Sequence, residues 1–293
     1  MMYEEITANK RKSILLIIAF IALISVLGWV FGWLLIGYGN IGLFIAVLIS
    51  IILVVVNYYN GDKLILKISR ARQPTKKENA YLINVVEEIA IAAGVPTPKI
   101  YIIDDSAPNA FATGRDPQHA SIAVTSGLLK KLNRLELEGV IAHEMSHIKN
   151  YDIRLMMLAS VLVGVVVLIS DVMIRSFVYG ADSRDDRGGG VLLLVLALIL
   201  AVLSPLFAYL LQFSLSRKRE FLADANAALL TRYPEGLASA LEKISKDKDD
   251  LEVANRGTEP LYIVTPHNLK GRFGKLFSTH PPIEERIKRL RSM

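Results

Sequence analysis

The sequence contains no cysteine among its 293 residues. Disulfides and thiolate metal sites are therefore excluded, and any metal must be held by imidazole and carboxylate groups. Charge is also scarce, because Asp, Glu, Lys and Arg make up 21% of the residues whereas hydrophobic residues make up 52%. This balance, with a mean hydropathy of +0.39, argues against an ordinary soluble protein and indicates a membrane protein.

The net charge of +6 raises the question of nucleic-acid binding. The basic residues, however, gather at the ends of apolar runs, at residues 10–12, 63–77 and 217–219. No basic segment carries the interleaved aromatic residues or the helical pattern typical of nucleic-acid recognition. We therefore expect the charge to orient the chain in a lipid bilayer, and we expect no nucleic-acid partner.

Four apolar runs are each long enough to cross a bilayer core, which takes about 20 helical residues. They lie at residues 13–36, 41–59, 155–174 and 191–213. A very short link joins the first two runs, which predicts a tight hairpin, and the last two predict a second hairpin. Basic residues lie before the first run, after the second run and after the fourth run. Both termini are therefore expected in the cytoplasm. The first run is too long for a signal peptide and predicts a retained anchor.

The segment between the hairpins has the pattern of a folded domain. A helix at 76–93 is predicted to bury one apolar stripe, formed by Leu82, Val85, Val86, Ile89 and Ala93. Strands are predicted at 99–104, 109–114 and 120–125, the last two antiparallel. Asn133 is the expected N-cap of another helix, with Glu136 completing a capping box. After the second hairpin, the pattern predicts helices at 221–230 and 234–246, a strand-like segment at 261–264 and a basic helix from Pro282.

The helix after Asn133 carries the sequence HEMSH at residues 143–147. Residues four apart share one helical face, so His143 and His147 can point ring nitrogens at one ion. Glu144 lies beside them, where it can take a proton from a water whose pKa zinc lowers to about 7. The alternative is a polar helix face that carries two histidines by chance, which this spacing of three fixed residue types disfavours.

A catalytic zinc ion usually has three protein ligands and one open position. His147 precedes the third apolar run, so the chain is expected to return to the same side just after the fourth. There Glu220 and Asp224 lie four apart on one helical face. Glu220 is the predicted third ligand, and Asp224 the predicted acceptor for an imidazole N–H of a ligand. Alone, this acidic pair would balance the basic residues 217–219 at a membrane surface, but the topological match favours ligation.

These motifs carry a family resemblance. HEMSH, followed by a membrane hairpin and EFLADA, resembles the HtpX-type membrane metalloproteases, which are related to the prenyl-protein (CAAX-type) endopeptidases. The resemblance extends to PNAFATGR, HEMSHIKNYD, SRKREFLADA and FSTHPPIEERI. It implies a gluzincin-type endopeptidase of a prokaryotic plasma membrane, with one Zn²⁺ per chain and a cytoplasmic site that cleaves membrane or misfolded proteins in quality control and stress response. On matching positions it assigns zinc to His143, His147 and Glu220, and catalysis to Glu144.

The expected fold class is an α+β membrane protein. Two transmembrane hairpins, at 1–60 and 155–214, are predicted to alternate with two cytoplasmic parts of a mainly helical, zincin-like protease that carries a small sheet. The first part, 61–154, holds the HExxH helix, and the second, 215–293, holds the third ligand. The expected partners are protein or peptide substrates, including membrane proteins, and the lipid bilayer. The sequence leaves the oligomeric state open.

Other residues have two interpretations each. The segment Asn109, Ala110, Phe111 and Ala112 can be an edge strand that pairs with an extended substrate, or an ordinary half-buried strand. His280 and Arg286 can reach the cleft as catalytic residues and stabilise the anionic tetrahedral intermediate. For His280 the start of a helix at Pro282, with Glu284 and Glu285 at its positive end, explains the sequence slightly better.

Two rival functions fit the sequence less well. An intramembrane protease would place the site within the bilayer, which the polar residues 134–152 around His143 disfavour. A zinc carrier or scaffold would need no catalysis. However, a structural site normally closes all four positions with protein ligands, and a transporter places its ligands at midplane depth.

Overall fold

A computed structural model describes residues 2–75, 78–180, 217–254, 258–266 and 281–293, with the single positions 195, 199 and 203. Helices α1 (Met2–Ile36) and α2 (Gly39–Ile68) form the predicted tight hairpin. Within the described part of the chain, Glu4–Val30 and Gly39–Ile68 are long and apolar enough to cross a membrane. Both helices extend beyond their apolar runs, because nothing in the flanking sequence ends them.

The hairpin is closed by direct backbone contact. A Cβ atom on Gly42 would lie 2.1 Å from the carbonyl oxygen of Gly28 and 2.6 Å from Cα of Gly32. Larger residues at these positions would therefore push the two helices apart. The outward faces carry exposed apolar side chains, such as Ile14, Trp33, Phe44 and Leu48. Such continuous apolar exposure suits contact with lipid rather than water.

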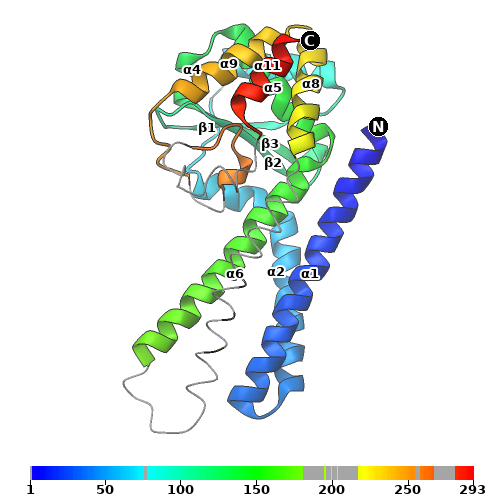
Figure 1. The fold of residues 1–293 in the computed structure, drawn as a ribbon, viewed down its shortest axis with the longest axis vertical. Coiled ribbons are helices and arrows are strands. Elements are labelled where there is room, and N and C mark those ends of the chain that lie inside the picture. The colour runs from blue at the N-terminus through cyan, green and yellow to red at the C-terminus, as the bar shows by residue number, and fades with distance from the viewer. Residues whose placement is uncertain are drawn as a thin grey trace.

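Helix α6 (Asp152–Gly180) contains the third apolar run and lies beside α1 and α2. Figure 1 shows these three helices running together away from the rest of the molecule. The preceding helix α5 (Arg134–Lys149) meets α6 at 82°. Within the described residues, α5 and the part of α6 from Asp152 to Leu168 are together long and apolar enough to cross a membrane, as one bent pair. The predicted fourth run at 191–213 lies outside the described residues apart from 195, 199 and 203.

The sheet is small and mixed. Strands β1 (Lys99–Ile103), β2 (Ala110–Gly114) and β3 (Ala120–Thr125) are ordered β1-β3-β2, with β1 parallel and β2 antiparallel to β3. A 3-10 turn, η1 (Pro117–His119), joins β2 to β3. Side chains alternate between the two faces: Ala110 and Ala112 enter the main core, whereas Phe111 faces the core beside α6. The sheet is therefore covered on both faces.

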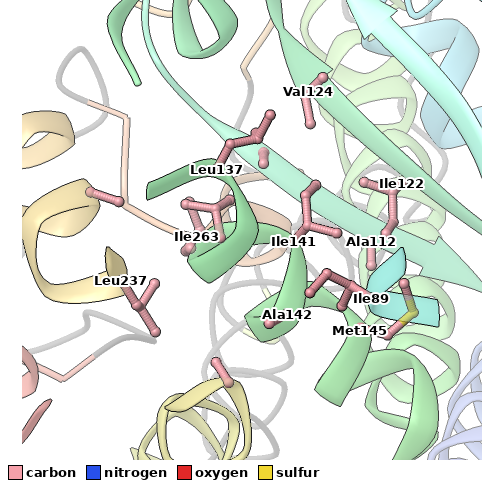
Figure 2. Packing of buried hydrophobic residues seen from close by; sticks show 14 of the residues in the cluster. Ile89, Ala112, Ile122, Val124, Leu137, Ile141, Ala142, Met145, Leu237 and Ile263 are labelled. Atoms are coloured by element: carbon pink, nitrogen blue, oxygen red, sulfur yellow. The ribbon is translucent and has the colours of Figure 1, made fainter. Parts of the chain in front are cut away.

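The remaining helices form, with the sheet, what we call the head. They are α3 (Ala80–Ala93), α4 (Ser126–Lys131), α5, α8 (Arg217–Thr231), α9 (Pro234–Lys246) and α11 (Ile283–Arg291). Helix α5 crosses the centre of the head, where Ile141 lies beside Ala112 and Ile122 of the sheet and Met145 lies beside Ile89 of α3 (Figure 2). The predicted capping box is confirmed, since Asn133 and Glu136 bond each other's backbone N–H groups.

Most predicted elements are confirmed, with three differences. The helix predicted at 221–230 is longer, because α8 already includes Arg217. The helix predicted from residue 76 begins at Ala80. The prediction of a strand-like segment at 261–264 is wrong. Leu261 ends a 3-10 turn, η3 (Glu259–Leu261), and residues 262–264 form no strand. A single backbone bond joins this segment to β2, from Ile263 N–H to the Ala110 carbonyl, at 3.0 Å. Its apolar residues are buried, but one bond does not make a strand.

Candidate metal centre

The two histidines of HEMSH face one point in the head. His143 and His147 lie one turn apart on α5, both buried, with ring centroids 4.7 Å apart. Their Nε2 atoms are separated by 3.2 Å. Glu220, on α8, approaches from a segment that is distant in sequence. Its carboxylate oxygens lie 3.4 Å from His147 Nε2 and 3.8 Å from His143 Nε2.

This donor set fits a single divalent cation. Within the described residues, ligand atoms of His143, His147 and Glu220 all lie within 4.8 Å of one another. Atoms bound about 2.0–2.2 Å from one tetrahedral zinc ion would lie about 3.3–3.6 Å apart. The separations between donor atoms are close to that spacing, so small side-chain shifts suffice to bind the ion.

The contacts of the two Nδ1 atoms explain why both Nε2 atoms point toward Glu220. His143 Nδ1 lies 3.0 Å from Asp224 Oδ1, and His147 Nδ1 lies 3.0 Å from Asp152 Oδ2. An ionised carboxylate can only accept a hydrogen bond, so each Nδ1 carries the proton. In the neutral rings, both Nε2 atoms then present lone pairs toward Glu220. Asp224 thus makes the predicted contact, whereas Asp152 was missed by the sequence reasoning.

Glu144 follows His143 on α5 and is 2% exposed. Burial, with the negative charge of Glu220 nearby, raises the pKa of Glu144 to about 7. A hydrogen bond from the backbone N–H of Ala112 and the charges of His147 and Arg286 act in the opposite direction. A carboxyl group with a pKa near neutrality can both accept and return a proton.

The two histidines differ in their affinity for protons. Burial, supported by the charges of Arg286 and His147, lowers the pKa of His143 to about 4. Burial also acts against a charged His147, but hydrogen bonds to Asp152 and Glu220 outweigh it and raise the pKa of His147 well above its usual range. In the absence of an ion, His143 is therefore neutral at pH 7, whereas His147 holds a proton.

Arg286 comes from α11 and is fully buried. Its guanidinium bonds both oxygens of Asp224, at 2.9 and 2.7 Å, and lies 3.4 Å from Glu220 Oε2. It also donates to the Ile263 carbonyl at 3.1 Å. Burial would raise the pKa of Asp224, but Arg286 and His143 hold it below its usual value. Arg286 therefore joins two acidic residues of the site, while His280 lies outside the described residues.

Strand β2 lies beside α5 at an edge of the sheet. The backbone of Asn109 bonds Thr125, next to β3, and its side chain donates to the Val264 carbonyl. By the alternation of antiparallel pairing, Phe111 also faces β3. Ala110 and Ala112 instead direct backbone groups to the free edge, toward Ile263 and Glu144. Of the four predicted substrate-binding residues, only these two present their backbone there.

The chain is similar to known proteins over nearly its whole length. Residues 76–293 match the family model described as Peptidase family M48. A curated protein named Protease HtpX homolog, from Dictyoglomus thermophilum, is 54% identical over 99% of this chain and 94% of its own length. One of the same name from Thermoanaerobacter pseudethanolicus is 46% identical over 100% and 98%.

A solved structure, titled Crystal Structure of S. mikatae Ste24p, superposes with a TM-score of 0.51 at 20% identity. The match covers 84% of this chain but only 57% of that one. At this level of identity the likeness concerns the fold alone.

Proposed function

The chain belongs to peptidase family M48, and from that premise we propose that it is a zinc-dependent endopeptidase that cleaves membrane or misfolded proteins at the cytoplasmic face of a prokaryotic plasma membrane. The family and the names of its relatives make it a membrane metalloprotease.

One observation carries the proposal. Two imidazoles whose Nδ1 atoms each contact a carboxylate direct their Nε2 atoms, together with the Glu220 carboxylate, at one buried point. Such a set leaves a fourth tetrahedral position without a protein ligand, as catalytic zinc sites do. Bound zinc would supply a Lewis acid that lowers the pKa of water and stabilises negative charge on a peptide carbonyl oxygen.

The surrounding residues have separate roles in this proposal. Glu144 accepts a proton from the attacking water and returns it to the leaving amine. Asp224 and Asp152 fix the rotation of the two imidazoles. Arg286 orients Asp224 and Glu220, and a role for Arg286 or His280 in stabilising the oxyanion remains a prediction. The free edge of β2, at Ala110 and Ala112, suits backbone pairing with an extended substrate.

The proposed orientation places both termini and the head in the cytoplasm. Hairpins at 1–60 and 155–214 would anchor the two protease parts, 61–154 and 215–293, with basic residues on the cytoplasmic side. Two described helical spans support the first hairpin. Cysteine labelling of single-cysteine variants in intact cells can test this topology without background, because the chain has no native cysteine.

The test of catalysis is Glu144→Gln. This variant should retain zinc, because Glu144 is not among the three proposed ligands, and should lose about 10²–10⁴-fold in the cleavage rate of casein by detergent-solubilised protein. The matched control is Glu138→Gln on the same helix, whose side chain pairs with Arg134 instead. Casein cleavage by Glu144→Gln at the wild-type rate would refute the role of Glu144, and zinc without cleavage in the wild type would favour a scaffold.

A further inference from the structure

The start of the first membrane helix lies against the junction between α5 and α6. Asn9 of α1 is 1% exposed, and its Nδ2 donates to the Asn150 carbonyl at 2.9 Å and to Asp152 Oδ1 at 2.6 Å. The neighbouring Lys10 places its Nζ atom 4.4 Å from the centroid of the Tyr151 ring. Two consecutive residues of α1 therefore contact the two residues that link α5 to α6 and the first residue of α6.

That link is a sharp elbow. Tyr151 has a φ of +61°, a left-handed conformation that bulky residues rarely adopt. Such a conformation persists only where surrounding contacts determine it. Asn9 provides contacts on both sides of Tyr151, because one amide nitrogen bonds the carbonyl before it and the carboxylate after it.

Asp152, at the elbow, also contacts a histidine of the site. Its Oδ2 lies 3.0 Å from His147 Nδ1, while its Oδ1 accepts from Asn9 and, at 3.3 Å, from Nη1 of Arg219. Arg219 directly precedes Glu220 in α8. A carboxylate bonded through both oxygens has a fixed plane, and the imidazole that donates to it has a fixed rotation.

We propose that Asn9 is a positioning residue of the metal centre: it fixes Asp152, Asp152 aims the His147 ring, and the first membrane helix thereby completes the site. This inference rests on the proposed metal site. Asn9 Oδ1 has no hydrogen-bond partner among the described residues, so two acceptors alone orient the amide. An apolar residue of similar size would fill the same space but would leave Asp152 without this donor.

A merely structural role for Asn9 would anchor α1 without affecting the ion. The two roles separate in a double-mutant cycle on zinc affinity, measured with full-length, detergent-solubilised protein against a competing chelator. The variants are Asn9→Leu, Asp152→Asn and both together. The matched control is Asn60→Leu, an exposed asparagine of α2 that bonds Val56 and Lys63 of its own helix.

Asn9→Leu should weaken zinc affinity about 3- to 10-fold, less than the roughly 10- to 100-fold typical of a residue that bonds the ligand itself. Asn60→Leu should leave it unchanged. With Asp152→Asn already present, Asn9→Leu should have little further effect, because residues in one network are coupled. An equal effect in both backgrounds, or wild-type affinity in Asn9→Leu, would overturn the inference.

His143→Ala separates this inference from the proposed function. Loss of zinc from His143→Ala, with wild-type affinity in Asn9→Leu, would refute the role of Asn9 alone. Retention of zinc by His143→Ala would refute the ligand set itself. If Asn9→Leu does not fold, Asn9→Ser, whose side chain is too short to bond both acceptors, takes its place in the same cycle.

Discussion

The two histidines of the site are oriented by residues from opposite ends of the chain. His143 bonds Asp224, which Arg286 holds from the last helix of the chain. His147 bonds Asp152, which Asn9 holds from the first helix. One imidazole therefore depends on packing within the head, whereas the other depends on how a membrane helix docks against it.

The largest expected effect is on the free energy of unfolding, when the contacts that orient His143 from within the head are removed. Arg286→Met leaves Asp224 and Glu220 buried without their guanidinium partner, which should cost about 3–5 kcal/mol of unfolding free energy. Urea unfolding in detergent, followed by circular dichroism, measures the loss. Arg289→Met, on the exposed face of the same helix, should lose much less. Equal stability of the two variants would show that the guanidinium does not stabilise this side.

The next effect tests whether the contacts that orient His143 are independent of those that orient His147. Asp224→Asn and Asp152→Asn should each weaken zinc affinity about 10- to 100-fold, because each removes the acceptor of one ligand imidazole. Adding Asn9→Leu to Asp224→Asn should weaken zinc binding by the same factor as in the wild type, since Asn9 contacts only the Asp152 side. Competition titrations with a chelator measure these affinities. Coupling between Asn9 and Asp224 would merge the two sides into one network.

The smallest effect is a difference in pH dependence. Because its pKa is raised, His147 holds a proton that the metal must displace. Zinc affinity should therefore fall about tenfold per pH unit on acidification near neutrality. Asp152→Asn removes the acceptor that raises this pKa and should flatten the slope, whereas Asp224→Asn should not. Zinc titrations from pH 6 to 8 distinguish the variants, and an unchanged slope in Asp152→Asn would assign the proton elsewhere.

The sequence alone predicted the features of the site that depend on helical spacing or on the order of the apolar runs. The i, i+4 histidines, the capping box at Asn133 and the convergence of Glu220 follow from helical periodicity and from the order of the apolar runs. The hairpin of α1 and α2 was predicted for the same reason. These signals are local, or depend only on which side of a membrane a segment occupies.

The parts that were missed depend on long-range packing. Asp152 follows a left-handed residue at an elbow, and helical spacing gives no indication that it would turn back toward His147. Asn9 is separated from Asp152 by 143 positions and lies in an otherwise ordinary turn of α1. The segment 261–264 has the composition of a strand, but only Ile263 bonds the edge of β2. Composition alone does not decide which backbone groups find partners.

The close approach of Gly28 and Gly42 has a consequence at the far end of α1. Because the two backbones touch there, α1 cannot slide along α2 without separating from it. A shift of one helical turn would displace every residue of α1 by about 5.4 Å, which would carry the Asn9 amide out of reach of Asp152. A pair of residues without side chains thus sets the axial register on which the geometry of a remote histidine depends.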